Sequence, residues 1–188
     1  MSAIVPRPDE IRPDPLTQAD YEAIKGVLRT YRDTLIVKLL RGTGLRISEA
    51  LSLTRAHVND SGLDSVLTVM RGKQAGAPLW DRVPLPRGLG LELRDYIRGQ
   101  PRHQEERIFP VTTRRIQQVV RAAGIAAIGR PVHPHEFRAL YIKHMLDAGA
   151  PPAMVAKLVG HSDVRITMAH YYGLTLAQRQ EVANATPV

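Results

Sequence analysis

Cysteine is absent from this 188-residue sequence, which excludes disulfide bonds, thiolate nucleophiles and metal sites built on cysteine. Aromatic residues are scarce, with two Phe and one Trp, which argues against base stacking as the main mode of nucleic-acid recognition. No apolar run approaches the roughly 18 residues that span a membrane, and no apolar segment of a secretory signal is found. We therefore expect a cytoplasmic protein with no membrane association.

Positive charge, in contrast, is abundant. The sequence has 26 Lys and Arg against 18 Asp and Glu, which gives a formal net charge of +8 and a pI near 10.2. A basic excess of this size is typical of proteins that bind a phosphate backbone. Ribosomal and other basic proteins share it, so the charge alone does not establish DNA binding.

The apolar pattern divides the chain into two parts. Residues 1–15 contain four prolines and no periodic apolar pattern, which predicts a linker or arm. Residues 16–188 show helical spacing over most of their length and are expected to form one domain. Between Val66 and Leu85 this spacing fails, and two β-prone runs separated by Gln74-Ala75-Gly76 predict a hairpin. The sequence thus predicts a mainly α fold with a small antiparallel β-hairpin or sheet (α+β).

Capping and stop residues locate the helices. Thr17 and Asp20 form a capping box at the start of the first helix, and glycines at 42 and 44 predict the end of the second. Further helices are expected from about 48, around 89–97, over 114–123 with an end at Gly124, over 133–149, over 151–160, from about 162 and from about 175.

Two basic residues in the first half of the chain stand at the ends of predicted elements. Arg46 precedes a helix, where its guanidinium can bind a phosphate through two hydrogen bonds. A surface pair with Glu49, one helical turn on, explains the same arginine. Lys73 lies at the tip of the predicted hairpin, as a solvated turn residue or as a mobile ammonium group that reaches a leaving-group oxygen.

Five further candidate residues lie in the second half: two of its histidines, one arginine and two tyrosines. His135 and Arg138 share a face at the first turn of a predicted helix, where free N–H groups and the helix dipole favour an anion. The alternative is a helix-start histidine and a surface arginine. His161 follows a helix-ending glycine, and Tyr171 and Tyr172 come shortly afterwards. A pair of tyrosines usually packs in a core, so spacing alone makes neither one a nucleophile.

Taken together, these segments resemble the catalytic domain of the tyrosine recombinases, a family that includes phage integrases, Xer-type resolvases and transposon integrases. The likeness covers about residues 16–182, in the family's order and at its spacing. The matching boxes are G-L-R-I-S-E (44–49), G-K (72–73) followed by R-V-P-L (82–85), I-F-P (108–110), P-H-E-F-R (134–138) and V-G-H-S-D (159–163). Each box alone is a weak signal, and their succession makes a chance likeness very improbable.

The resemblance implies a transesterification on double-stranded DNA that needs no metal, ATP or other cofactor. Arg46 and Arg138 would clamp the scissile phosphate and stabilise the charge of the transition state. Lys73 would protonate the departing 5′ oxygen, His135 would assist proton transfer, and His161 would hydrogen-bond the phosphate. A tyrosine would attack to give a 3′-phosphotyrosyl bond.

The nucleophile departs from the commonest family spacing, which falls on His170 in this sequence. Family members with the tyrosine one position later lead us to prefer Tyr171 over Tyr172. On a helix the two side chains point about 100° apart, so only one of them can face the phosphate.

The function implied by the resemblance is site-specific recombination, in a bacterium or a phage-infected host cell, by a protein that forms a dimer or tetramer on DNA. Two alternatives remain open. The first is a type IB topoisomerase-like strand transferase, with the same covalent chemistry but no exchange between partner strands. The second is a non-catalytic DNA-binding module of the same fold.

The family usually carries an N-terminal core-binding domain, which is not apparent in these residues, so we expect a catalytic fragment. The segment from Thr175 is expected to dock on a neighbouring protomer or to form a solvated tail.

Overall fold

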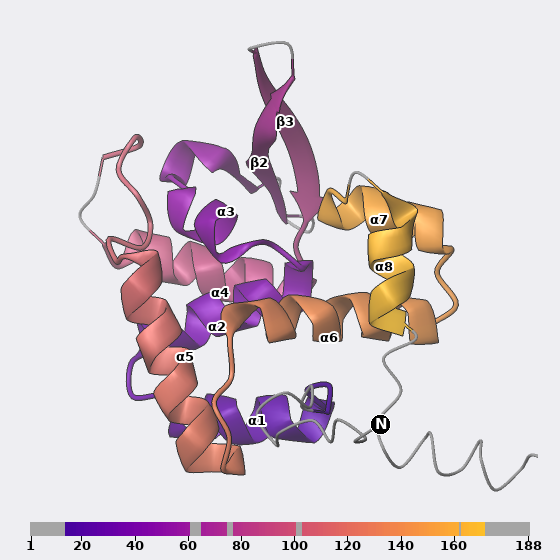
Figure 1. The fold of residues 1–188 in the computed structure, drawn as a ribbon. Coiled ribbons are helices and arrows are strands. Elements are labelled where there is room, and N and C mark those ends of the chain that lie inside the picture. The colour runs from indigo at the N-terminus through magenta and orange to yellow at the C-terminus, as the bar shows by residue number, and fades with distance from the viewer. Residues whose placement is uncertain (1–13, 61–64, 75–76, 101–102, 162, 172–188) are drawn as a thin grey trace, which may run out of the picture.

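The computed structural model describes residues 14–60, 65–74, 77–100, 103–161 and 163–171. Within these ranges the chain is mainly helical, with a small antiparallel sheet (Figure 1). The elements are α1 (Gln18–Val27), α2 (Tyr31–Thr43), α3 (Ile47–Ser52), the 3-10 turn η2 (Arg55–His57), β1 (Val58–Asp60), β2 (Ser65–Gln74), β3 (Ala77–Pro84), α4 (Arg87–Arg98), α5 (Thr113–Ile128), α6 (Pro134–Asp147), α7 (Pro152–Val159) and α8 (Val164–Tyr171). The predicted fold class is confirmed.

Local signals placed most helix ends correctly. Thr17 caps α1, and its side chain and that of Asp20 bond each other's backbone N–H groups, which is the predicted capping box. Gly44 ends α2 in the left-handed conformation, with φ of 65°. Gly160 ends α7 in the same way, with φ of 68°.

The predicted end of α5 at Gly124 is wrong, because the helix continues to Ile128. Gly124 is buried in the helix, and a Cβ atom there would lie 2.6 Å from Cγ2 of Val132. This glycine therefore permits close packing against the next segment of the chain. The stop is Gly129, which takes the left-handed conformation with φ of 73°.

The sheet contains one strand more than the hairpin predicted by the sequence. Strands β2 and β3 pair antiparallel, and the short β1 pairs with the other edge of β2, so the order is β1-β2-β3. Three residues are too few to show the alternation that identifies a strand. In Figure 1 the β2–β3 hairpin projects away from the helices.

Helix α6 links the two hydrophobic clusters of the described residues. Its first half contributes Phe137 and Leu140 to the large cluster, which joins α1–α5 and the sheet. Its second half contributes Ile142 and Leu146 to a smaller cluster with α7. Helix α8 packs against both α6 and α7. The start of α6 and the end of α7 are thereby held in fixed positions in the fold.

In the described part of the chain, no helix has the length and apolar character needed to cross a membrane. The expected helix from about 175, most of the predicted arm, and Tyr172 lie outside the described residues.

Candidate active site

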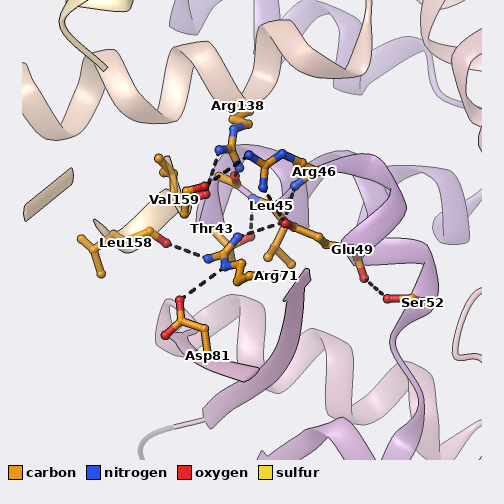
Figure 2. Close-up of polar contacts among 12 residues, drawn as sticks. Thr43, Leu45, Arg46, Glu49, Ser52, Arg71, Asp81, Arg138, Leu158 and Val159 are labelled. Carbon is orange, nitrogen blue, oxygen red and sulfur yellow. Dashed lines mark hydrogen bonds and ion pairs between the residues drawn. The ribbon is translucent and has the colours of Figure 1, made fainter. Parts of the chain in front are cut away.

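The end of α7 binds three arginines that come from three different elements. The carbonyl oxygens of residues 156 and 157 accept the N–H group of Gly160, which caps the helix. The next three carbonyl oxygens accept from arginine side chains (Figure 2). The donor and acceptor pairs are Arg71 with Leu158 (2.7 Å), Arg138 with Val159 (2.7 Å) and Arg46 with Gly160 (3.2 Å). A helix C-terminus carries partial negative charge and free carbonyl groups, so it is a suitable place to hold cations.

One buried carboxylate, that of Glu49, joins two of these arginines. Its Oε1 atom pairs with Nη1 of Arg46 and its Oε2 atom with Nη1 of Arg71, both at 2.9 Å. Oε2 also accepts the backbone N–H of Arg46 at 2.8 Å, at the start of α3. The pairing of Arg46 with Glu49 expected for a surface arginine is therefore present. The side chain of Arg46 nevertheless remains 43% exposed, and it is accessible to a ligand.

Arg138 is almost fully buried, with 1% of its surface exposed. Its interpretation as a surface arginine is wrong, because it lies on the inward face of α6. It donates to the carbonyl oxygens of Gly44 and Val159. The pKa of Arg138 is lowered to about 10, first by burial and then by the positive charges of Arg46 and Arg71, against the opposing effect of Glu49. A positive charge crowded in this way is stabilised by an anion.

His135 lies in the first turn of α6, one turn before Arg138. Loss of hydration lowers the pKa of His135 below its ordinary value, and the charges of Arg138 and Arg46 lower it further. His135 lies three residues before Arg138 on the same helix, so the two side chains share a face of α6. The lowered pKa favours the neutral form, which can accept a proton, in the absence of an anion.

His161 is held between α7 and α8. Its backbone N–H donates to the carbonyl oxygen of Ala156 at 2.9 Å. A hydrogen bond of 2.9 Å joins its Nδ1 atom to Oγ1 of Thr167, a fully buried residue of α8. His161 follows Gly160, whose carbonyl binds Arg46, so this ring is fixed at the edge of the arginine cluster.

The structure thus brings Arg46, His135, Arg138 and His161 together at the start of α6 and the end of α7. Lys73 is placed only by its backbone, which lies on β2 opposite Pro78; its side chain lies outside the description. The same holds for Tyr171, the last residue of α8. The nucleophile and the general acid therefore stay predictions.

Sequence reasoning missed Arg71 and Thr167 and gave Glu49 only a surface role. A signal for Arg71 was available, because inward-facing residues alternate along β2 at Leu67 and Val69. Arg71 continues this series, and a cation at an inward position indicates a buried partner. No comparable signal identifies Thr167, whose hydroxyl group is indistinguishable in the sequence from that of a surface threonine.

The comparisons with known proteins agree on one family. The model of the phage integrase family matches residues 15–177. The tyrosine recombinase XerA of Thermococcus kodakarensis is 32% identical over 169 residues, which are 84% of this chain and 57% of that protein. XerA of Pyrococcus furiosus is 30% identical over 180 residues, 88% of this chain and 59% of its own. The chain thus spans less than two thirds of the length of these curated relatives.

Solved structures share the fold. The crystal structure of XerA recombinase matches with a TM-score of 0.71 at 19% identity, covering 94% of this chain and 66% of that one. The catalytic domain of bacteriophage HP1 integrase matches with a TM-score of 0.62 at 20% identity, covering 93% of this chain and 96% of that one.

Proposed function

Because this chain belongs to the phage integrase family, we propose that it is the catalytic part of a site-specific DNA recombinase. In this proposal it cuts and rejoins DNA strands through a covalent 3′-phosphotyrosyl intermediate. The supporting observation is the arginine cluster at the end of α7, where Arg46 and Arg138 donate to neighbouring carbonyl groups. The DNA strand would supply the anion that these charges require.

Arg46 and Arg138 would clamp the scissile phosphate in different ways. Arg138 is buried and bound to two carbonyl oxygens, so its charge is preorganised and does not need to reorganise during the reaction. Arg46 is partly exposed, so it can turn its guanidinium towards a non-bridging oxygen. Together they would stabilise the negative charge on the non-bridging oxygens in the transition state.

Lys73 and the two histidines would handle protons and orientation. Lys73 would give a proton to the departing 5′ oxygen. His135, whose pKa is lowered, is suited to accept a proton near neutral pH. His161, oriented by Thr167, would hydrogen-bond the phosphate.

Tyr171 would be the nucleophile, with Tyr172 as the alternative. Attack of its phenolic oxygen forms the bond to phosphorus while the bond to the 5′ oxygen breaks. The phosphodiester energy is kept in the new bond, so a 5′ hydroxyl group of another strand can reverse the step. This chemistry needs no cofactor.

Double-stranded DNA is the proposed partner, and solved relatives support it. A crystal structure shows the XerH site-specific recombinase bound to its difH substrate, and another solved structure shows the Tn1549 transposon integrase in complex with circular intermediate DNA. We propose that this chain also self-associates on DNA as a dimer or tetramer, acts in the cytoplasm, and works together with an N-terminal core-binding domain. Phosphate contacts dominate such binding, so affinity should fall steeply with salt. An affinity that is flat between low and moderate ionic strength contradicts DNA binding through this cluster.

A covalent-capture experiment tests the chemistry. The protein is incubated with nicked duplexes of randomised sequence, in which cleavage beside the nick releases a short fragment and traps the protein on the DNA. Adducts that survive a denaturing gel are sequenced, which also identifies the target site. We expect adducts with the wild type and with Tyr172→Phe, and none with Tyr171→Phe.

The opposite result for the two variants makes Tyr172 the nucleophile. No adduct with the wild type supports the non-catalytic module. An adduct that rejoins only its own duplex, and never a second captured duplex with a different flank, supports the topoisomerase-like alternative.

A further inference from the structure

Arg71 connects the projecting hairpin to the arginine cluster. Its side chain is 5% exposed, and its guanidinium contacts three different elements. It pairs with Glu49 of α3 at 2.9 Å, donates to the carbonyl oxygen of Leu158 at the end of α7 at 2.7 Å, and pairs with Asp81 of β3 at 3.3 Å. Figure 2 shows Arg71 between these three partners.

A β-bulge lies at Arg71, whose side chain keeps the inward direction of Leu67 and Val69. Met70 pairs with Trp80 and Gly72 with Leu79, so Arg71 is the extra residue between two successive pairs. A bulge of this kind bends the strand and increases its twist locally. The side chain of Arg71 packs over Gly160, where a Cβ atom would lie 3.1 Å from its Cδ atom.

The hairpin beyond this point is less well supported by the body of the protein. Gly72 and residues 77–80 are exposed. Lys73 lies two residues after Arg71, and strand geometry puts their Cα atoms about 7 Å apart. The anchorage of Arg71 therefore controls where the backbone of Lys73 stands relative to Arg46 and Arg138.

Arg71 is poorly placed to bind the phosphate itself. Its Nε, Nη1 and Nη2 atoms all have protein partners, whereas the Nε atom of Arg138 has none among the described residues. The contribution of Arg71 to a reaction would have to pass through another residue.

We infer that Arg71 is a positioning residue, which holds the hairpin so that the ammonium group of Lys73 meets the leaving 5′ oxygen. This inference rests on the proposed function. In the step concerned, the tyrosine hydroxyl gives its proton to His135 and its oxygen bonds to phosphorus, while the bond from phosphorus to the 5′ oxygen breaks and a proton passes from Lys73 to that oxygen.

A substrate with sulfur in place of the bridging 5′ oxygen tests the inference. A thiol is far more acidic than an alcohol, with a pKa of about 8.5, so the sulfur leaves without a general acid. Cleavage rates are measured on the captured duplex in its oxygen and sulfur forms, with the same preparation of each variant. The ratio of the two rates does not depend on the fraction of protein that is folded or active.

Lys73→Ala and Arg46→Lys are the reference variants. Loss of a general acid lowers cleavage by about 10²–10⁴-fold, so we expect that loss for Lys73→Ala on the oxygen substrate and recovery on the sulfur substrate. Arg46→Lys acts on the phosphate clamp and should slow both substrates equally. If Lys73→Ala is equally slow on both, the proposed role of Lys73 fails, whatever Arg71 does.

Arg71→Gln and Arg71→Lys test the inference itself. Arg71→Lys keeps the charge beside Glu49 but has a single nitrogen, which cannot serve all three partners. We expect both variants to behave like Lys73→Ala. They should cleave the oxygen substrate slowly, and their ratio of the sulfur rate to the oxygen rate should be higher than that of the wild type. A ratio equal to that of the wild type, with or without a lower rate, overturns the inference.

Discussion

Arg138 on α6 donates a hydrogen bond to the carbonyl oxygen of Gly44, the residue that ends α2. Gly44 has φ of 65°, and a Cβ atom there would lie 2.5 Å from Cδ1 of Tyr141 and 3.0 Å from Cγ1 of Val159. Val159 supplies the other carbonyl that binds Arg138. The glycine thus permits both the turn of the backbone and the close packing that position the buried arginine.

Substitution of this glycine separates the two effects. Gly129 also has positive φ, of 73°, but has no neighbour within 4 Å of its missing Cβ. Gly129→Ala should cost about 1 kcal/mol for the left-handed conformation alone. Gly44→Ala should cost that and about 1–3 kcal/mol more for overpacking. Urea unfolding of both variants measures the difference, and equal losses contradict the packing argument.

The charge balance of the cluster depends on Glu49. Glu49→Gln removes the buried carboxylate that pairs with Arg46 and with the buried Arg71, which keeps its longer pair with Asp81, and we expect a loss of about 3 kcal/mol in the free energy of unfolding. Glu92 offers a matched control, because its pair with Lys38 at 2.6 Å is partly exposed on both sides. Glu92→Gln should cost less than about 1 kcal/mol. Similar losses for the two variants show that burial does not decide the strength of the pair.

The pKa of His135 should report the arrangement of charge around α6. Its folded value is lower than that of the unfolded chain, so between the two values the unfolded chain binds more protons. Stability therefore rises with pH through this window and falls as the pH drops below about 6.5. NMR titration of the imidazole measures the pKa directly.

Arg46→Met removes one of the charges that lower this pKa and should raise it, whereas Arg114→Met on α5 should leave it unchanged. Binding of the captured duplex should also raise it, because a phosphate opposes the arginine charges. A value that responds to neither Arg46→Met nor DNA shows that the imidazole is distant from the cluster.

The hydrogen bond between Thr167 and His161 should fix the imidazole for its role. Thr167→Val keeps the shape of the side chain but removes the hydroxyl group, at a cost of about 1 kcal/mol in stability. We expect slower formation of the covalent adduct with Thr167→Val and recovery with Thr167→Ser, which keeps the hydroxyl. If Thr167→Val and Thr167→Ser form the covalent adduct at equal rates, Thr167 contributes only through packing.

The sequence by itself determined the features that depend on nearby residues. Capping by Thr17 and Asp20, the stops at Gly44 and Gly160, and the β2–β3 hairpin all follow from short-range geometry, and the family boxes carried the candidate residues. Gly124 misled the prediction, because a glycine that permits close packing has the same identity as one that ends a helix.

Only the tertiary structure decided that Arg138 is buried, that Arg71 anchors the hairpin, and that consecutive carbonyl groups at the end of α7 bind three arginines. The partners are far apart in the chain, as for Arg46 and Gly160, which are separated by 114 positions. Every residue has a backbone carbonyl group, so no residue type marks which of them will accept a hydrogen bond. That choice is made when the start of α3, strand β2 and helix α6 come together at the end of α7 and direct their arginine side chains at its carbonyl groups.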